Sequence, residues 1–339
     1  MQSQISPTTD CRRCQILMKR FIWLLLAVLL CQYGWSQKPQ RQKVGLVLGG
    51  GGAKGAAEVG VLKVIEEVGI PIDYIAGTSI GSIVGGLYAV GYRAADLDSM
   101  FQTQEWMSLL ADREEEHKNE VISEEDGVVY ILGFPISRRN SKSKDPNFGA
   151  VKGDHIVELF DSITGMRDSV DFSTLPIPFR CVAVDVKNHR EVVLSSGVLS
   201  KCMRASMAIP GAFKPVQING KTLVDGGVLN NLPADVVKAM GADIVIAIDL
   251  TQKKHETRNF SLKEYTGIGG WLDWAVSRPD WKKYNDNLQL VDVYINPNLD
   301  GYGSTSFGKK SISEMIRIGE MAGRKKINEL KKVKKMVGR

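Results

Sequence analysis

The sequence predicts an α/β protein built from alternating strands and helices. Residues 44–48 form a continuous apolar run, which is typical of a parallel strand buried on both faces. A glycine turn at 49–52 and a helical pattern at 53–68 follow this run. A second apolar run at 74–76 then leads through a serine-containing turn into another helical pattern at 82–90. This repeated strand–turn–helix order indicates a layered α/β domain.

The later part of the chain continues the alternation with weaker patterns. Helices are expected at 156–164, 199–208 and 234–240, and strands at 179–186, 191–194, 222–224 and 242–250. The first two of these strands are expected to form a hairpin around Asn188. We also expect an exposed helix end at 111–120, a polar surface loop at 138–147 and a closing helix at 311–335.

The N-terminal residues have the pattern of an export signal. Lys19 and Arg20 precede an apolar run at 21–31. Gly34 and Ser36 then place small residues where a signal peptidase requires them. A bilayer-spanning helix takes about 20 apolar residues, so this shorter run is not expected to span. An uncleaved amphipathic anchor is the alternative interpretation.

Composition and charge give weaker limits on function. The chain has 339 residues, of which 43% are hydrophobic and 24% charged, so a large core is expected. Its formal net charge of +6 is mild, and no nucleic-acid partner is expected. Residues 324–339 alone carry a net charge of +7, so the rest of the chain is close to neutral. This basic segment is either a solvated helix face or a surface that attracts anionic lipid.

Cysteine usage gives no indication of a metal site. Cys11 and Cys14 have the spacing of half a zinc site, but no second pair follows them. Removal of the signal would leave Cys181 and Cys202, whose spacing does not decide whether they form a disulfide.

The most informative segment is Gly77–Gly81, which fits the pattern Gly-x-Ser-x-Gly. This pattern places a serine on a sharp turn between a strand and a helix. Because the flanking glycines have no Cβ, the backbone can bend tightly and leave the serine oxygen clear of the main chain. Ser79 is therefore a candidate nucleophile.

The glycine turn at 49–52 has several interpretations. Gly50, Gly52 and Gly55 match the dinucleotide-binding pattern Gly-x-Gly-x-x-Gly. The acidic residue at the expected distance, Asp73, precedes the second strand rather than following it. Ala56 stands where a phosphate-binding Walker loop requires lysine. An oxyanion hole remains the favoured interpretation, because amides on a glycine turn at a helix start are unobstructed donors. A purely structural turn is the other alternative.

A third segment supplies a candidate base. Asp225 follows the apolar run at 222–224 and precedes Gly226 and Gly227, so a tight loop could fix its carboxylate, although an Asx turn is an alternative. The chain has four histidines: His117, His155, His189 and His255. None of them stands in a glycine-rich loop at a strand end, and a Ser–Asp–His arrangement with His255 is the less favoured option. The simpler arrangement is a dyad in which burial raises the pKa of Asp225.

Together these segments resemble the patatin-like phospholipase family. The match covers about residues 44–249, with motifs in the family's order at Gly50–Gly55, Gly77–Gly81 and Asp225–Gly227. A fourth matching block, Ser206–Phe213, is a segment that the family places beside the site.

The resemblance implies a three-layer α/β/α domain with a mostly parallel central sheet. It also implies a dyad of Ser79 as nucleophile and Asp225 as proton acceptor, with an oxyanion hole from the Gly50, Gly51 and Gly52 amides. The implied reaction is hydrolysis of lipid acyl esters, of the phospholipase A or lysophospholipase type, without a metal or organic cofactor. The implied motif positions are Gly50, Gly52, Gly55, Gly77, Ser79, Gly81, Asp225, Gly226 and Gly227.

Two positions depart from the family pattern. Glu58 stands where many members have histidine, and Gly49 where many have serine. Neither is a dyad position, so little effect on the chemistry is expected. An acyltransferase using the same dyad and a lipid-binding protein without turnover are the alternative functions.

The predicted organisation has four parts. Residues 1–36 are the signal peptide, with Met18 as an alternative start, and 37–43 are a linker. Residues 44–310 are the patatin-like acyl hydrolase domain, and 311–339 a basic helix with a tail that could meet a membrane surface. We expect a bacterial, stand-alone protein that is exported and is periplasmic, secreted or membrane-associated. The chain is too short for the membrane-barrel domain that follows the hydrolase in some exported relatives.

Overall fold

A computed structural model describes most of the chain. The described residues are Met18, Arg20, Phe21, Trp23, 41–111, 122–125, 128–131, 134–136, 149–252 and 280–338. Internal contacts divide the chain into the units Met1–Arg41 and Gln42–Arg339. Across the described residues, no helix combines the length and apolar character needed to cross a bilayer. The predicted helix end beyond residue 111, the loop at 138–147, His117 and His255 lie outside the described residues.

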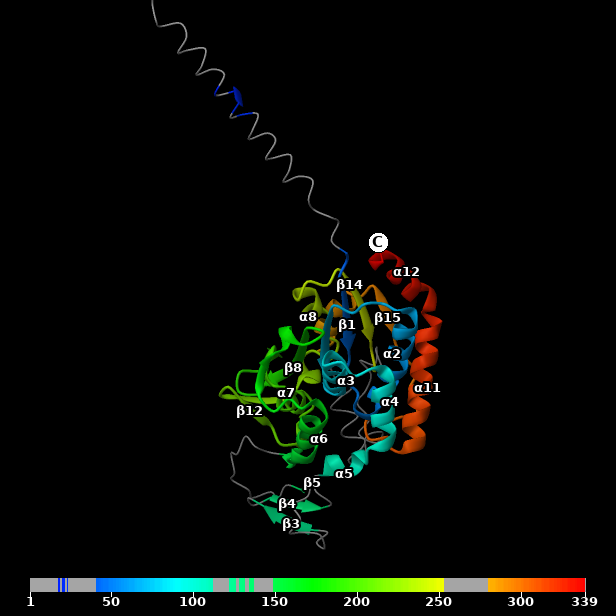
Figure 1. The fold of residues 1–339 in the computed structure, drawn as a ribbon. Coiled ribbons are helices and arrows are strands. Elements are labelled where there is room, and N and C mark those ends of the chain that lie inside the picture. The colour runs from blue at the N-terminus through cyan, green and yellow to red at the C-terminus, as the bar shows by residue number, and fades with distance from the viewer. Residues whose placement is uncertain are drawn as a thin grey trace, which may run out of the picture. The chain divides into compact units, whose positions relative to one another are not determined.

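The larger unit is built on a central sheet (Figure 1). Its eight strands run in the order β12-β13-β8-β2-β1-β14-β15, with β9 paired to β8. Their bounds are β1 Val44–Leu48, β2 Tyr74–Thr78, β8 Phe179–Asp185, β9 Arg190–Leu194, β12 Val216–Ile218, β13 Lys221–Asp225, β14 Ile244–Ile248 and β15 Val293–Ile295. The neighbours from β8 to β15 pair in parallel. The pairs β8–β9, β8–β13 and β12–β13 are antiparallel. The sheet is therefore mostly parallel, with its antiparallel strands at one edge.

Helices cover both faces of this sheet. The helices within the described residues are α2 Ala56–Val68, α3 Ile80–Ala89, α4 Ala94–Thr103, α5 Trp106–Ala111, α6 Asp154–Thr164, α7 Leu199–Ser206, α8 Ala234–Ala239, α10 Trp281–Leu288, α11 Lys309–Lys325 and α12 Ile327–Val337. Leu46 and Leu48 of β1 pack into the larger apolar cluster with α2, α3, α7 and α11. Val47 packs into a second cluster with Val237 of α8 and Tyr284 of α10. Because neighbouring strand residues point to opposite faces, these clusters define a three-layer α/β/α arrangement.

Short elements surround the main layers. The strands β7 Ser169–Asp171 and β10 Ser196–Val198 form one antiparallel pair, and β6 Gly149–Val151 and β11 Gly211–Phe213 form a parallel pair. A separate three-stranded sheet contains β3 Ile122–Glu125, β4 Val128–Ile131 and β5 Phe134–Ile136. The part of the chain that the structure describes also contains the 3₁₀ turns η1 Gly52–Gly55, η3 Phe172–Thr174 and η4 Gly226–Val228.

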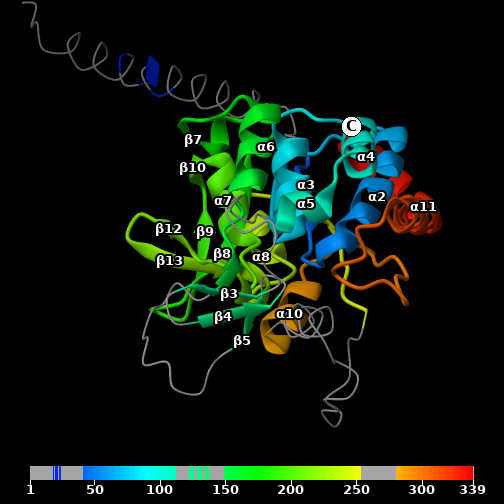
Figure 2. The same ribbon diagram turned by 90° about the horizontal axis from the view of Figure 1, so that it is seen from below.

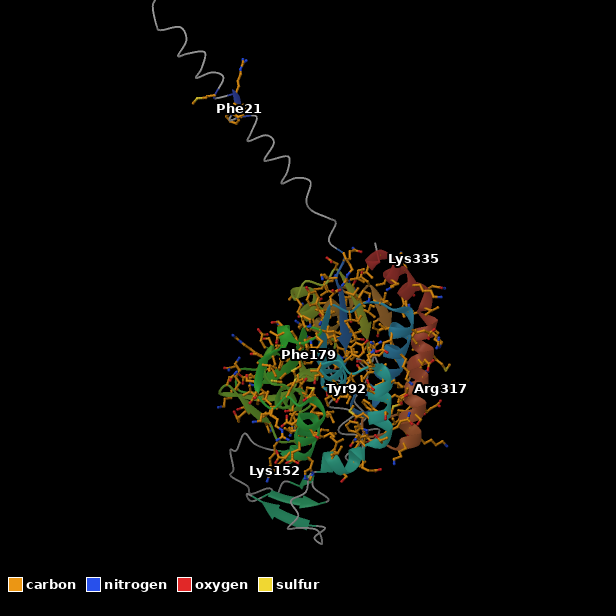
Figure 3. The ribbon with its side chains drawn as sticks, in the orientation of Figure 1. Phe21, Tyr92, Lys152, Phe179, Arg317 and Lys335 are labelled. Carbon is orange, nitrogen blue, oxygen red and sulfur yellow. The ribbon has the colours of Figure 1, made fainter. Side chains whose placement is uncertain are left out.

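The C-terminal segment forms two helices where one closing helix was predicted. The backbone changes direction at Lys326, between α11 and α12. Leu330, Val333 and Val337 of α12 are buried, so this break turns the apolar side of α12 into the core. Figures 1 and 2 both show α11 running beside α2. Figure 3 shows Arg317 and Lys335 on the outer side of the two helices. The buried apolar side chains of α12 therefore pack on the domain.

The predicted elements that fall within the described residues are present with small shifts at their ends. The hairpin around Asn188 is confirmed by the antiparallel pairing of β8 with β9. The second strand extends two residues further than predicted, to Thr78, and its helix begins at once with Ile80. This extension matters because it leaves Ser79 as the single residue between strand and helix.

Candidate active site

Ser79 occupies a sharp turn at the carboxyl end of β2. Its backbone has φ 55° and ψ −125°, a left-handed conformation that a non-glycine residue seldom adopts. A Cβ at Gly77 would lie 2.2 Å from the Gly81 carbonyl oxygen, and one at Gly81 would lie 2.4 Å from the Leu48 carbonyl oxygen. Both flanking positions therefore require glycine for the backbone to pass so closely. The strain at Ser79 is held by the strand and helix on either side.

The Ser79 hydroxyl meets the Asp225 carboxylate directly. Its Oγ donates to Asp225 Oδ2 at 2.7 Å, although the two residues are 146 positions apart. Asp225 ends β13, which lies next to β8, and β8 in turn lies next to β2. The second carboxylate oxygen, Oδ1, accepts from the Gly227 amide at 2.7 Å, which fixes the direction of the side chain. The structure thus brings the two predicted dyad residues together.

The Asp225 carboxylate is nearly enclosed, and this changes its acidity. The exposed fraction is 4% for Asp225 and 3% for Ser79. Burial raises the pKa of Asp225 to about 6, and the hydrogen bonds from Ser79 and Gly227 offset part of that rise. A carboxylate with a pKa near 6 takes a proton from an alcohol better than an ordinary aspartate does. The pair therefore has the geometry and the basicity of a nucleophile with its base.

The glycine turn after β1 lies against this pair. A Cβ at Gly50 would stand 3.1 Å from the Ser79 Cβ and 2.3 Å from Oδ1 of Asn231. Gly52 has φ 59° and a Cβ there would lie 2.5 Å from the Ser304 carbonyl oxygen. Glycine is therefore required at both positions, for close approach to the serine and for a left-handed turn.

The three predicted oxyanion-hole amides differ in their hydrogen bonding. The Gly50 amide donates to the Asn231 carbonyl oxygen at 3.3 Å, so it is already engaged. The amides of Gly51 and Gly52 have no hydrogen-bond partner within the part of the chain that the structure describes. This leaves Gly51 and Gly52 as the available donors, at the start of η1 and α2 where a helix dipole favours negative charge.

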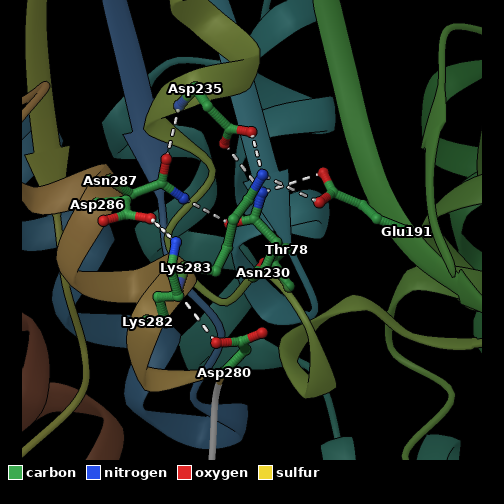
Figure 4. Close-up of polar contacts among 9 residues, drawn as sticks. All are labelled: Thr78, Glu191, Asn230, Asp235, Asp280, Lys282, Lys283, Asp286 and Asn287. Atoms are coloured by element: carbon green, nitrogen blue, oxygen red, sulfur yellow. Dashed lines mark hydrogen bonds and ion pairs between the residues drawn. The ribbon is translucent and has the colours of Figure 1, made fainter. Parts of the chain in front are cut away.

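Two further side chains, those of Ser206 and Thr78, hold the nucleophile turn. The Ser79 amide donates to Ser206 Oγ at 3.0 Å, and Ser206 Oγ donates to the Val182 carbonyl oxygen at 2.6 Å. The Thr78 hydroxyl donates to the Asn230 carbonyl oxygen at 2.8 Å (Figure 4). Ser206 lies inside the Ser206–Phe213 block that resembles the family. The Asn230–Asn231 pair shortly after Asp225 could also have been noticed in the sequence as a candidate part of the site.

The alternative interpretations of these motifs receive no support. Asp73 accepts hydrogen bonds from the Val44 amide and the Lys43 side chain before β2 begins. At the end of β2, where a dinucleotide-binding acid would follow, Ser79 stands instead. Of the described histidines, His155 lies at the start of α6 and His189 in the β8–β9 turn. The Ser79–Asp225 contact thus forms without a described histidine between the two side chains.

Glu58 is the unusual residue beneath the glycine turn. It lies in the first turn of α2 with no exposed surface, and neither carboxyl oxygen has a hydrogen-bond partner among the described residues. Burial raises the pKa of Glu58 well above its usual range, and the Asp249 carboxylate raises it further. Burial therefore favours the uncharged form of the Glu58 carboxyl group.

The two cysteines of the larger unit, Cys181 and Cys202, are buried free thiols. No group of three or more metal-ligating side chains occurs among the described residues. The candidate site consists of Ser79, Asp225 and the glycine turn at 49–52, which lies against them.

Comparison with known proteins identifies the same region. A family model described as "Patatin-like phospholipase" matches residues 46–238. Lysophospholipase nte1 of Aspergillus fumigatus is 30% identical over 308 residues, covering 85% of this chain and 18% of that protein. Patatin-like phospholipase domain-containing protein 6 of Mus musculus is 30% identical over 290 residues, covering 78% of this chain and 19% of that protein. The chain thus spans about a fifth of the length of these curated relatives.

The solved structures that align with this chain have lower sequence identity to it. VipD from Legionella pneumophila aligns with a TM-score of 0.42 and 15% identity, covering 85% of this chain and 67% of that chain. The ExoU–SpcU complex of the Pseudomonas aeruginosa type III secretion system aligns with a TM-score of 0.42 and 16% identity, covering 88% of this chain and 53% of that chain.

Proposed function

The chain belongs to the patatin-like phospholipase family, and we propose that it is a serine hydrolase of lipid acyl esters, of the phospholipase A or lysophospholipase type. The observation that carries the proposal is the 2.7 Å hydrogen bond between Ser79 Oγ and Asp225 Oδ2. The relatives named lysophospholipase and patatin-like phospholipase support the same substrate class.

The proposed reaction begins with attack by Ser79 on the ester carbonyl carbon. As the Oγ–C bond forms, the hydroxyl proton passes to Asp225 Oδ2, which already accepts the hydrogen bond. The negative charge moves to the carbonyl oxygen, where the amides of Gly51 and Gly52 donate to it. Removing one such donor from an oxyanion hole typically lowers the rate by about 10²–10³.

The intermediate then collapses to an acyl-Ser79 ester. The bond to the leaving alcohol breaks, and the proton on Asp225 passes to that alcohol. In the second half, Asp225 takes a proton from water while the water oxygen attacks the acyl carbon. Collapse of this second intermediate releases the fatty acid and returns the proton to Ser79.

The experiment measures fatty acid released from phospholipid and lysophospholipid vesicles by the full chain. We expect release by the wild type and none by Ser79→Ala at matched folding, judged by circular dichroism. Equal release by both proteins would contradict the proposal. Transfer of the acyl group to an added alcohol in place of water would instead indicate an acyltransferase, and binding without release would indicate a lipid-binding protein.

We further propose that the basic side of α12 attracts the domain to anionic membranes. Three exposed lysines of α12, and a fourth at the end of α11, have no ion-pair partner among the described residues: Lys331, Lys332, Lys335 and Lys325. The neighbouring cations are engaged, Arg324 with Glu67 and Glu320, and Lys326 with Glu329. Each lysine near an anionic surface contributes about 1 kcal/mol of attraction.

The position of α12 limits what such attraction can do. The Lys334 side chain donates to the Gly69 carbonyl oxygen, in the connection that leads into the amino end of β2. Ser79 follows the opposite, carboxyl end of β2. The basic face would therefore raise the local concentration of enzyme at a membrane rather than press the serine against it. Export through the predicted signal at residues 1–36, to the periplasm, the medium or a membrane, remains part of this proposal.

A further inference from the structure

Asn231 contacts the glycine turn through both its main chain and its side chain. Its carbonyl oxygen accepts from the Gly50 amide at 3.3 Å, and its Nδ2 donates to the Gly50 carbonyl oxygen at 3.3 Å. The same Nδ2 also lies 3.5 Å from the Thr251 hydroxyl. Asn231 is 2% exposed, so these bonds form away from bulk water. Asn231 thus hydrogen-bonds both the amide and the carbonyl oxygen of Gly50.

The side-chain oxygen of Asn231 fills the space between two parts of the site. A Cβ at Gly50 would lie 2.3 Å from Asn231 Oδ1, and a Cβ at Gly227 would lie 2.7 Å from it. Asn231 therefore stands between the glycine turn and the loop that follows Asp225. Its Oδ1 is buried and has no hydrogen-bond partner among the described residues. Because an unpartnered buried acceptor costs stability, its retention is typical of a functional site.

The preceding residue anchors Asn231 to the fold (Figure 4). Asn230 Nδ2 donates to Glu191 and Asp235, each at 3.0 Å. Asn230 Oδ1 accepts from Asn287 Nδ2 of α10 at 2.9 Å. The backbone carbonyl oxygen of Asn230 accepts from the Thr78 hydroxyl. Lys283 pairs with Asp235 at 2.5 Å and lies 3.4 Å from Glu191, which balances part of the negative charge. These hydrogen bonds tie Asn230, and with it the backbone leading into Asn231, to β2, β9, α8 and α10.

From this arrangement we infer that Asn231 is a positioning residue for the hydrolysis. It holds the Gly50 backbone against Ser79 and so places the next two amides, those of Gly51 and Gly52, where the oxyanion forms. The inference rests on the proposed function. Asn231 does not touch the Ser79–Asp225 hydrogen bond, so it acts on oxyanion stabilisation and leaves proton transfer to Asp225 unchanged.

The first test compares the full-length Asn231→Ala variant with the wild type on a p-nitrophenyl acyl ester. We expect kcat to fall about 10- to 100-fold and KM to change less than about threefold, because loss of exact geometry acts mainly on the transition state. The pH at which the rate profile inflects is expected to be the same in the variant as in the wild type. Asn188→Ala, which removes an asparagine side chain from the β8–β9 turn, is the matched control and is expected to retain wild-type kinetics.

The second test uses the close contact between Gly50 and Asn231. In Gly50→Ala the new methyl group meets Asn231 Oδ1 at 2.3 Å, and Asn231→Ala removes that oxygen. We therefore expect the double variant to lose less activity than the product of the two single losses. Multiplicative losses would mean that the two residues act independently.

The outcomes separate the inference from the proposed function. An inactive wild type would contradict the proposed function, and the inference with it. An active wild type with Asn231→Ala within threefold of its kcat would overturn the inference alone. If Asn231→Ala does not fold, the isosteric Asn231→Asp takes its place, since it also lacks the donor to Gly50. Activity loss that matches the unfolded fraction in that variant would also overturn the inference.

Discussion

The Ser79 amide and the Ser206 hydroxyl are joined by a 3.0 Å hydrogen bond across 127 positions of the chain. This bond holds the strained nucleophile turn from the side of α7, because Ser206 is the last residue of that helix. Ser206 Oγ in turn donates a hydrogen bond to the Val182 carbonyl oxygen on β8. The serine turn is thus tied to the strand that also pairs with the Asp225 strand.

Replacing Ser206 by alanine would leave the Ser79 amide buried without its acceptor. We expect Ser206→Ala to lose about 1–3 kcal/mol of unfolding free energy, the usual cost of a buried unsatisfied group. A small displacement of Ser79 can lower the rate by about 10²-fold, so kcat should fall by more than the unfolded fraction explains. Denaturant unfolding and steady-state kinetics on one protein batch provide the check. Ser99→Ala on α4 is the control, since Ser99 is exposed at the surface.

The raised pKa of Asp225 predicts how activity depends on pH. The active form is the carboxylate, so kcat/KM should rise with pH through about 6 and level off above it. Asp225→Asn removes the base, and we expect a loss of about 10²–10⁴ together with the loss of this inflection. A profile measured between pH 4.5 and 8.5 tests the assignment. Activity that is flat across pH 5 to 7 in the wild type would rule out Asp225 as the titrating base.

Glu58 predicts a pH dependence of stability. Its pKa is raised in the folded protein by burial, so its contribution is fully present below the unfolded pKa of about 4.3. That contribution is lost as the pH rises toward the folded pKa. Glu58→Gln, which cannot ionise, should therefore gain stability relative to the wild type between pH 4.5 and pH 8. Urea unfolding across this range measures the difference.

The control for Glu58 is Glu105→Gln, whose side chain is 74% exposed. We expect its unfolding free energy to follow the wild type at every pH. A constant difference between Glu58→Gln and wild type would show that Glu58 ionises normally in the fold.

The basic face of α12 predicts salt-sensitive binding to anionic vesicles. We expect Lys331→Glu/Lys332→Glu/Lys335→Glu to weaken sedimentation with phosphatidylserine vesicles at low salt and to leave neutral vesicles unaffected. Hydrolysis of a soluble ester should be unchanged, because α12 lies by the amino end of β2. Lys187→Glu on the exposed β8–β9 turn is the control for charge alone. Binding equal to wild type in the triple variant would remove α12 from the membrane proposal.

The local chemistry of glycine explains why much of the site was predictable from sequence. Gly77 and Gly81 are required by contacts within their own turn and with the end of β1, and such turns have a recognisable pattern. The approach of Asp225 to Ser79 depends on β13 lying beside β8, which no local pattern specifies. The dyad was predicted from the lack of a suitably placed histidine and from the resemblance to a known family.

Other features depend on packing and were not predictable. The strands β12 and β15 have three residues each, too few to show an alternating pattern. The break at Lys326 interrupts a continuous helical pattern, because buried Leu330 and Val333 must turn toward the core. Asn231 acts through contacts with residues far away in the chain, so its sequence neighbours did not indicate its role.

The most direct measurement of the central claim is covalent labelling of the full chain by a fluorophosphonate probe, with the modified peptide mapped by mass spectrometry. We predict a single labelled residue, Ser79, with labelling abolished in Ser79→Ala and slowed at least a hundredfold in folded Asp225→Asn. Absence of label from the folded wild type, or equal labelling rates in wild type and Asp225→Asn, would contradict the proposed dyad.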